Sequence, residues 1–258
     1  MLLNYIHWSV NPEIFPDVLP VRWYGLLFAA AFFFGYIILM RIFKHEKLPE
    51  NLLDQLATYV FIATIIGARL GHVFFYEPEY FLANPLSILK IWEGGLASHG
   101  AAIGILIAIW LFSRKNKKSF FWVLDRLVIV VALGGFFIRM GNLMNSEIYG
   151  KVTTVPWAFI FTSQDELPRH PTQIYEGLSY LLIFAYLLWY YWKNDGKPKE
   201  GFIFGMFLIL LFTVRFLIEF VKEPQVAFET NMTLNMGQWL SIPFILAGFY
   251  IVLRKPRK

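Results

Sequence analysis

Three long stretches of this 258-residue chain carry almost no charge, and this feature restricts the fold more than any other. Residues 23–40 and 230–253 contain no Asp, Glu, Lys, Arg or His, and residues 94–113 contain only His99. A helix needs about 20 mostly apolar residues to cross a bilayer. The three stretches therefore predict membrane-spanning helices.

Four further segments are apolar with only isolated charges, and they extend the same prediction. They are residues 52–76, 120–138, 174–192 and 201–221. The chain is 57% hydrophobic and 16% charged, whereas soluble domains are usually about 45–50% apolar and about 25% charged. We therefore expect an all-α integral membrane protein with about seven transmembrane helices, built as a single polytopic membrane domain over residues 1–258.

The positions of the basic residues predict how these spans are oriented. Fourteen of the 23 Lys and Arg residues lie in four short segments, residues 41–50, 114–118, 193–199 and 254–258. Seven alternating spans place all four segments on one side, and an excess of Lys and Arg marks the cytoplasmic side. We therefore expect the N-terminus outside and the C-terminus in the cytoplasm. The first 20 residues contain no Lys or Arg, unlike the basic start of a signal peptide, so the first span should be retained.

The outer loops are expected to carry additional structure. Residues 140–171 form the longest polar stretch, and we expect a small extracytoplasmic cap there, inserted between spans four and five. Residues 77–93 predict a second, interfacial arm. No inverted repeat joins the two halves of the sequence, which lowers the expectation of a secondary transporter.

The outer halves of the predicted spans hold a cluster of ionisable side chains, which are costly in a membrane and indicate function. They are Arg69, His72, His99, Arg139, Arg215, Glu219 and Glu223. The last three follow one another at intervals of four, so one helical face is expected to carry them. Two arginines in one apolar site suit a phosphate group, whose oxygens match the planar fork of guanidinium donors.

Structural roles remain open for the same residues. Arg215 and Glu219 could form only an ion pair between helices, and Arg69 with His72 could reach the lipid headgroups. Arg139 stands where span four is expected to end, and a helix C-terminus favours a cation in any case. His99 could be a hydrogen-bonded bundle residue, and Tyr24 could be a plain interfacial aromatic.

Small residues surround His99, and polar residues follow Arg139. Gly100 and Gly104 form a small-xxx-small face that permits close approach of another helix, which leaves room beside an imidazole able to accept a proton near neutral pH. After Arg139, glycine and asparagine residues are expected to introduce turns. Such polar backbone at the membrane edge is tolerated where it lines a cavity.

Two absences limit the chemistry. The chain contains no cysteine, so it has no cysteine nucleophile and no thiolate metal site of its own. The sequence also lacks a His-Glu-x-x-His pattern or a run of acidic ligands. We expect no cofactor, no metal and no nucleic-acid partner.

Five short motifs together resemble those of the bacterial prolipoprotein diacylglyceryl transferases. The most specific is residues 139–150, Arg-Met-Gly-Asn-Leu-Met-Asn-Ser-Glu-Ile-Tyr-Gly. Arg-Trp-Tyr-Gly at residues 22–25, Ser-His-Gly-Ala at 98–101, Arg-His-Pro-Thr-Gln-Ile-Tyr-Glu at 169–176 and Arg-Phe-Leu-Ile-Glu-Phe at 215–220 agree in order and spacing. The chain departs from the family pattern at Ala101, Ile138 and Leu143, which are small or apolar exchanges that affect the local backbone shape rather than the chemistry.

The resemblance implies a reaction, two substrates and a location. The family transfers the diacylglyceryl group of phosphatidylglycerol to the thiol of the lipobox cysteine of a preprolipoprotein, forms a thioether and releases glycerol 1-phosphate. This is the first step of bacterial lipoprotein maturation, and it takes place in the cytoplasmic (inner) membrane with the active site toward the outer leaflet. The attacking thiol belongs to the substrate, which agrees with a chain that has no cysteine.

The matched motifs also imply candidate site residues. His99 is expected to be the general base or proton shuttle, Arg139 to bind the lipid phosphate, and Arg215, oriented by Glu219, to neutralise it. Tyr24 is expected to donate a hydrogen bond near the headgroup. The headgroup pocket is expected to be formed by Asn142, Asn145, Glu147 and Gly150. His170 and Glu176 are secondary candidates that are expected to support the cap. Two alternatives remain: a transporter of an anionic lipid or solute that uses the arginines, and a phospholipid headgroup hydrolase.

Overall fold

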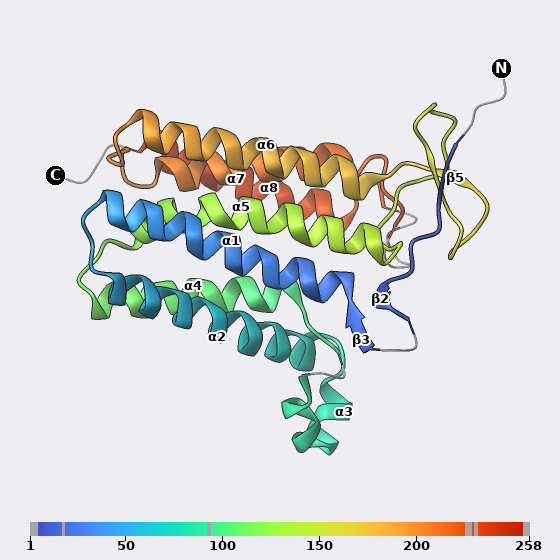
Figure 1. Ribbon diagram of the computed structural model, residues 1–258, viewed down its shortest axis with the longest axis horizontal. Coiled ribbons are helices and arrows are strands. Elements are labelled where there is room, and N and C mark those ends of the chain that lie inside the picture. The colour runs from blue at the N-terminus through green and yellow to red at the C-terminus, as the bar shows by residue number, and fades with distance from the viewer. Residues whose placement is uncertain (1–4, 17–18, 92–93, 225–228, 230–231, 255–258) are drawn as a thin grey trace. The chain divides into compact units, whose positions relative to one another are not determined.

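The computed structural model describes residues 5–16, 19–91, 94–224, 229 and 232–254, and this part of the chain is mainly helical (Figure 1). The chain forms two compact units. The first contains residues 1–39 and 125–258, and the second contains residues 40–124. Two helices run from one unit into the other, α1 (Trp23–His45) and α5 (Phe120–Met144).

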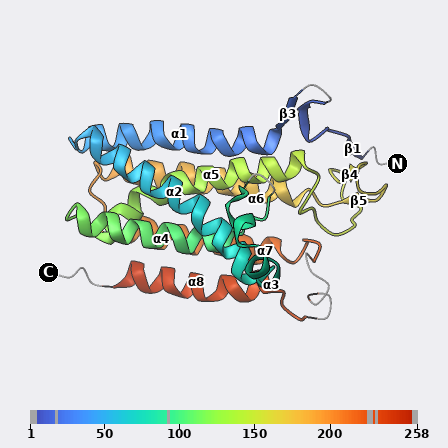
Figure 2. The ribbon, with the colours of Figure 1, turned by 90° about the horizontal axis from the view of Figure 1, so that it is seen from below.

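Helices make up most of the first unit. Beside its parts of α1 and α5 it contains α6 (Thr172–Lys193), α7 (Phe202–Ile218) and α8 (Met236–Leu253), and α7 runs side by side with both α6 and α8 (Figures 1 and 2). Aromatic rings join α1 to α5, because Phe34 and Phe137 stack with their ring centroids 5.7 Å apart. Helix packing by apolar side chains thus builds the frame that carries the site.

A buried carboxylate on α5 determines where α7 begins. Asp125 is fully buried, and its two oxygens accept hydrogen bonds from the main-chain N–H groups of Gly201 at 2.7 Å and Phe204 at 2.8 Å. The first N–H groups of a helix have no partner within the helix, and its N-terminus favours a negative charge. The acid inside the predicted fourth span is therefore a cap for another helix.

Among the described residues, strands from before α1 and from between α5 and α6 form two small sheets. Strand β4 (Phe159–Phe161) pairs in parallel with β1 (Ile6–Trp8) and antiparallel with β5 (Pro168–Arg169), and β2 (Glu13–Phe15) pairs with β3 (Leu19–Arg22). Leu143, Phe159 and Phe161 form a buried cluster that Trp8 covers. The first strand and the segment after α5 therefore fold together.

The end of α5 corrects the prediction that span four stops at Arg139. The helix continues to Met144, so the connection to α6 begins later than the predicted boundary at residue 140. Tertiary contacts explain the difference, since the buried side chain of Leu143 packs on Phe159 and Phe161, and its carbonyl accepts a hydrogen bond from the ring N–H of Trp8 at 3.0 Å. These tertiary partners outweigh the turn preference of the Gly141–Asn142 pair.

The second unit is built on a close helix pair, α2 (Glu50–Phe75) and α4 (Ser98–Lys115), which run side by side in Figures 1 and 2. Glycines meet where the helices approach: a Cβ atom on Gly100 would lie 2.6 Å from the Cα atom of Gly71, and one on Gly104 would lie 2.6 Å from the carbonyl oxygen of Ala63. The predicted small-residue face is confirmed. The arm between the two helices holds α3 (Pro78–Ala83) and the 3₁₀ helix η1 (Pro85–Leu89).

Replacing Gly100 with Leu should lower the stability of the protein by about 1–3 kcal/mol or more, because the added atoms have no room between α2 and α4. The midpoint of thermal unfolding in detergent measures this loss. Ala102→Leu is the matched control, since Ala102 lies two residues further along the same helix and is exposed. Equal midpoints for the two variants would contradict close packing at Gly100.

In the part of the chain that the structure describes, four helices are long and apolar enough to cross a membrane, namely α1, α2, α5 and α8, and α7 is a shorter apolar helix of 17 residues. Many large apolar side chains on these helices are exposed, as Phe33 on α1 and Leu246 on α8 illustrate with 62% and 63%. Exposed apolar surface on this scale is unusual for a soluble protein. The helical, multi-pass nature of the chain is therefore supported by length, composition and surface.

Candidate active site

A chain of buried ion pairs links three segments of the first unit. Arg139 on α5 pairs through Nε with a carboxylate oxygen of Glu176 on α6. The other oxygen of Glu176 lies 3.1 Å from Nζ of Lys222, which in turn lies 3.2 Å from Oε1 of Glu219. Glu176 is fully buried, and Lys222 and Glu219 are 4% and 8% exposed. Removing one partner of such a network would leave an uncompensated buried charge.

Arg215 is the most accessible cation of this network. Its Nε atom lies 3.8 Å from Oε1 of Glu219, and its side chain is 34% exposed. Glu219 is held more tightly by Asn235, whose Nδ2 donates to Oε2 at 2.9 Å. Gly237 makes room for this carboxylate, since a Cβ atom there would lie 2.5 Å from Oε1. The Arg215 guanidinium is thus oriented by Glu219 but keeps donors for an anion.

The last turn of α5 and the residues after it form a second polar group. Asn142 accepts a hydrogen bond from Nη1 of Arg139 at 3.0 Å and donates to Oε1 of Glu147 at 2.8 Å. Asn145 donates to the same Glu147 oxygen at 3.3 Å, while its own buried Oδ1 finds no hydrogen-bond partner in the part of the chain that the structure describes. This amide oxygen is available to accept a hydrogen bond from a ligand.

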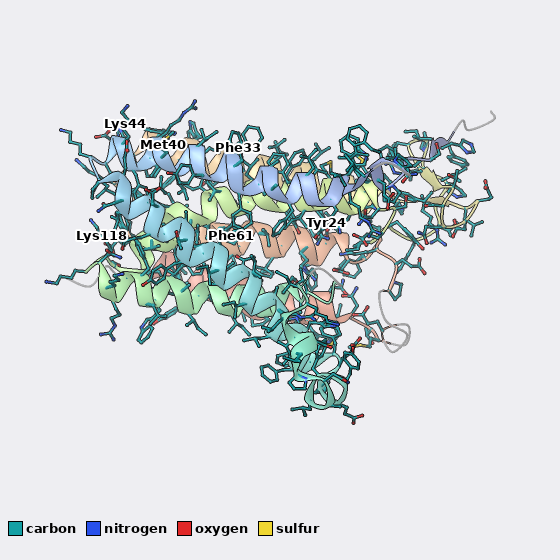
Figure 3. All side chains as sticks on the ribbon, turned by 60° about the horizontal axis from the view of Figure 1, so that its bottom comes forward. Tyr24, Phe33, Met40, Lys44, Phe61 and Lys118 are labelled. Atoms are coloured by element: carbon teal, nitrogen blue, oxygen red, sulfur yellow. The ribbon has the colours of Figure 1, made fainter. Side chains whose placement is uncertain are left out.

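Tyr24 faces this group from the first turn of α1, at the opposite end of that helix from Lys44 (Figure 3). Its ring packs on Gly141, where a Cβ atom would lie 2.7 Å from Cδ2 of the tyrosine. The hydroxyl interacts electrostatically with both Glu147 and Arg139. In the structure Tyr24 therefore lies beside residues of the 139–150 motif.

A polar pocket of about 350 Å³ opens beside these residues. Its lining brings together segments far apart in the sequence, because it combines Asn145 and Glu147, which follow α5, with residues from β2 and β3. The complete lining is Asn11, Pro12, Glu13, Arg22, Asn145 and Glu147. Acceptors and an arginine around one small cavity can bind a polyhydroxylated or anionic group.

Gly150 and His170 belong to the strand-bearing connection between α5 and α6. The N–H of Gly150 donates to the carbonyl of His170 at 2.8 Å, and a Cβ atom on Gly150 would clash with His170 and with the carbonyl oxygen of Val221. The His170 ring nitrogen Nδ1 lies 3.2 Å from the hydroxyl of Tyr175, and burial lowers the pKa of His170. Gly150 therefore lies against the turn after α7, and His170 holds Gly150 through this main-chain hydrogen bond.

Arg169 stabilises the same connection from outside the helices. Its guanidinium forms a salt bridge with Asp165 at 2.6 Å and lies 3.3 Å from Glu223. The hydrogen bond from Arg169 lowers the pKa of Asp165, and the same bond raises the pKa of Arg169. Since Asp165 is most stable in its ionised form here, this pair contributes stability that is lost as the pH falls through the pKa of the carboxyl group.

The second unit carries the predicted base. His99 is the second residue of α4 and is exposed. The ring of Phe75, at the end of α2, packs edge to face against the imidazole at 5.0 Å between centroids, and Tyr76 lies 5.9 Å away. An exposed imidazole held between aromatic rings has a restricted orientation and remains accessible to a substrate.

Arg69 and His72, which the sequence grouped with the candidate site, have structural contacts. Arg69 is 5% exposed, and its guanidinium donates to four main-chain carbonyls of the arm. The ring of His72 stacks on Tyr76, and its Nε2 lies 3.9 Å from a carboxylate oxygen of Glu77. The guanidinium of Arg69 is thus largely occupied and does not reach for lipid headgroups.

The prediction that Glu223 shares a helical face with Arg215 and Glu219 is wrong. Helix α7 ends at Ile218 and Glu219 is its C-terminal cap, so the chain has turned before residue 223. Glu223 pairs with Arg169 instead. The pairing of Arg215 with Glu219 four residues on is confirmed, because those two residues lie where the helical repeat still holds.

Most of the predicted site residues thus come together in the first unit, and His99 lies in the second. The predicted site did not include Lys222, Arg22 or Asn235. Lys222 could have been noticed as a cation three residues after Glu219, and Arg22 as the charged residue just before the first span. Asn235 could have been noticed as the start of an Asn-x-x-Gln capping box, which caps α8 in the structure, but that local pattern does not indicate its bond to Glu219.

The helices able to span a bilayer and the ion-paired polar site define an integral membrane protein with a buried charged centre. Comparison with known proteins gives the particular family. The sequence profile of prolipoprotein diacylglyceryl transferase matches residues 12–254. The chain belongs to this family and is a transferase.

The sequences of individual relatives match this chain over nearly their whole length. Three proteins named phosphatidylglycerol--prolipoprotein diacylglyceryl transferase illustrate this. The protein of Tolumonas auensis is 50% identical over 250 residues, covering 96% of each chain. The protein of Chloroherpeton thalassium is 46% identical over 257 residues, covering 99% of this chain and 96% of its own, and that of Porphyromonas gingivalis is 48% identical, covering 97% and 94%.

Proposed function

We propose that the protein transfers the diacylglyceryl group of phosphatidylglycerol to the lipobox cysteine of a preprolipoprotein. The reaction forms a thioether and releases glycerol 1-phosphate. The single observation that best supports this reaction is the network of Arg139, Lys222 and Arg215 with Glu176 and Glu219. Among the described residues joined by these ion pairs, three cations face two carboxylates, and this excess of one positive charge suits a lipid phosphate.

The chemistry divides into proton transfer and charge stabilisation. The substrate thiol has an ordinary pKa of about 8.5 and reacts as the thiolate. We assign its proton to His99, which is accessible and held by Phe75. The sulfur then forms a bond to the glyceryl carbon, and the bond between that carbon and the phosphate oxygen breaks. The electron pair leaves with glycerol 1-phosphate.

The guanidinium groups of Arg139 and Arg215 stabilise the charge that grows on the leaving phosphate. Tyr24 donates a hydrogen bond near the lipid headgroup. Asn142, Asn145 and Glu147 recognise the hydroxyl groups of the glycerol. The Asn145 Oδ1 has no hydrogen-bond partner among the described residues, and Glu147 lines the pocket. Gly150 and His170 keep the connection after α5 in place through their main-chain bond, and Glu176 holds Arg139.

The proposal includes the topology of the protein. Seven helices cross the bacterial cytoplasmic membrane, with the N-terminus and the active site toward the outer leaflet and the connection between α5 and α6 as an extracytoplasmic cap. One observation within each unit supports the proposal. Lys44 and Lys118 lie at the same end of the second unit (Figure 3), and in the first unit Lys199 donates to the carbonyl of Val252 near the C-terminus.

Incubating membranes that contain the protein with phosphatidylglycerol and a lipobox peptide tests the reaction. We expect the peptide to gain the mass of one diacylglyceryl unit on its cysteine, and a peptide with serine in that place should stay unmodified. Free diacylglycerol without peptide modification would indicate a headgroup hydrolase instead. Movement of intact lipid across the membrane, with no covalent product, would indicate a transporter.

A further inference from the structure

Arg69, near the end of α2, has almost every donor engaged by the main chain of the arm. Its Nε donates to the carbonyl of Ile88 at 2.9 Å and its Nη1 to those of Gly94 at 2.7 Å and Gly95 at 3.3 Å. Its Nη2 donates to the carbonyl of Ser87. A guanidinium has five N–H donors, so four bonds leave at most one donor for any other group.

The four carbonyls come from two separate parts of the arm. Ser87 and Ile88 belong to the end of η1, where carbonyls favour a cation, and the Ser87 carbonyl also accepts a hydrogen bond from the N–H of Lys90 at 3.2 Å. Gly94 and Gly95 belong to the return of the chain toward α4, and both have positive φ angles of 90° and 69°. The guanidinium thus joins the outgoing and returning parts of the arm to α2.

The Arg69 guanidinium is packed closely against the glycine pair on the segment that returns to α4. A Cβ atom on Gly95 would lie 2.9 Å from Nη1 of Arg69 and 2.6 Å from the His72 ring. On another side the guanidinium carbon lies 4.8 Å above the ring of Phe81, the buried residue of α3. Arg69 is therefore enclosed by α3, η1 and the glycine pair.

The contact of Arg69 with Gly94 and Gly95 lies a few residues before His99, the predicted base. Two residues after Gly95, the N–H of Ala97 donates to the carbonyl of Ala68 on α2 at 2.9 Å. Ala97 is the N-terminal cap of α4, and His99 is the second residue of that helix. The path of the chain into His99 is thus held to α2 at two consecutive places, by the side chain of Arg69 and by the main chain of Ala68.

We propose that Arg69 is a positioning residue that fixes the return of the arm against α2 and thereby sets the place of His99. The inference rests on the proposed role of His99 in thiol transfer. It assigns Arg69 no contact with the lipid phosphate, because its donors are occupied by carbonyls. A lysine cannot replace it, since a single ammonium group lacks the planar fork that spans both parts of the arm.

The kinetic test compares three variants with the wild type in the peptide assay. Arg69→Ala should lower kcat by about 100-fold, since a misplacement of about 1 Å can cost this much, and Arg69→Lys should recover little of it. Gly95→Ala should also lower kcat, although it keeps the arginine. The KM for phosphatidylglycerol should stay within about twofold. Arg41→Ala, at an exposed arginine of α1, is the control and should leave both constants unchanged.

A second measurement follows the arm itself and does not depend on activity. The chain has no cysteine, so Leu86→Cys introduces a single site for a spin label on η1, where Leu86 is 78% exposed. We expect the label to be markedly more mobile in the Arg69→Ala and Gly95→Ala backgrounds. A label at Phe61→Cys, in the middle of α2 (Figure 3) and 48% exposed, should show equal mobility in all backgrounds.

The outcomes separate this inference from the proposed function. Loss of kcat together with a mobile Leu86 label supports the positioning role, and Arg69→Lys and Gly95→Ala provide the test if Arg69→Ala does not fold. A raised KM for phosphatidylglycerol with an immobile label would overturn it in favour of a phosphate ligand. A mobile label with normal kcat would also overturn it. A wild-type protein that transfers nothing would instead refute the proposed function, while the label would still report on the arm.

Discussion

Replacing His99 with Gln should lower kcat for thiol transfer by about 10²–10⁴-fold, the range expected when a general base is removed. The amide keeps the size and polarity of the side chain but cannot accept the proton of the substrate thiol. Binding of phosphatidylglycerol should stay within about twofold, because the cations assigned to the phosphate are untouched. Single-turnover rates with a lipobox peptide and a separate lipid-binding titration measure the two quantities.

The control for this variant is His7→Gln, which changes an exposed histidine of β1 and should leave the rate unchanged. Raising the pH should partly restore the rate of the His99→Gln protein, since solvent hydroxide then generates more thiolate. Near-normal turnover at neutral pH would remove His99 as the base.

Replacing Arg139 with Ala should weaken binding of phosphatidylglycerol by about 10–150-fold, which corresponds to the 1.5–3 kcal/mol of a hydrogen bond to a charged group. The KM for the peptide should change little. The variant also leaves Glu176, which is fully buried, with Lys222 as its remaining partner, so the protein should lose stability as well. A lipid-binding titration and a thermal unfolding midpoint separate the two effects.

A double variant distinguishes the lost phosphate contact from the disturbed network. Arg139→Ala with Glu176→Gln removes the poorly compensated acid, so stability should recover while lipid binding stays weak. Arg139→Lys should bind lipid with intermediate strength because it keeps the charge but not the fork of donors. If only the peptide KM changed in the Arg139→Ala protein, the assignment of Arg139 to the phosphate would be wrong.

Local features of the site could be predicted from the sequence because they depend on neighbours along one helix. Gly100 and Gly104 lie one turn apart, and their close contact with α2 follows from that spacing. Arg215 and Glu219 pair for the same reason. The prediction failed at Glu223, because α7 ends before that residue, and at the end of α5, because that helix continues to Met144. Tertiary contacts decide where these helices end, and no local pattern contains them.

The sequence alone determined that the chain is helical, has several helices able to span a membrane and belongs with the transferases whose motifs it carries. These properties follow from apolar length, charge placement and short motifs, all of which are local. Only the tertiary structure decided which charges meet. Glu176 joins Arg139 to Lys222 across α5, α6 and the turn after α7, and Arg69 binds the arm rather than a ligand. Such pairings depend on how distant helices pack, because a buried charge takes whichever partner the packing brings within reach.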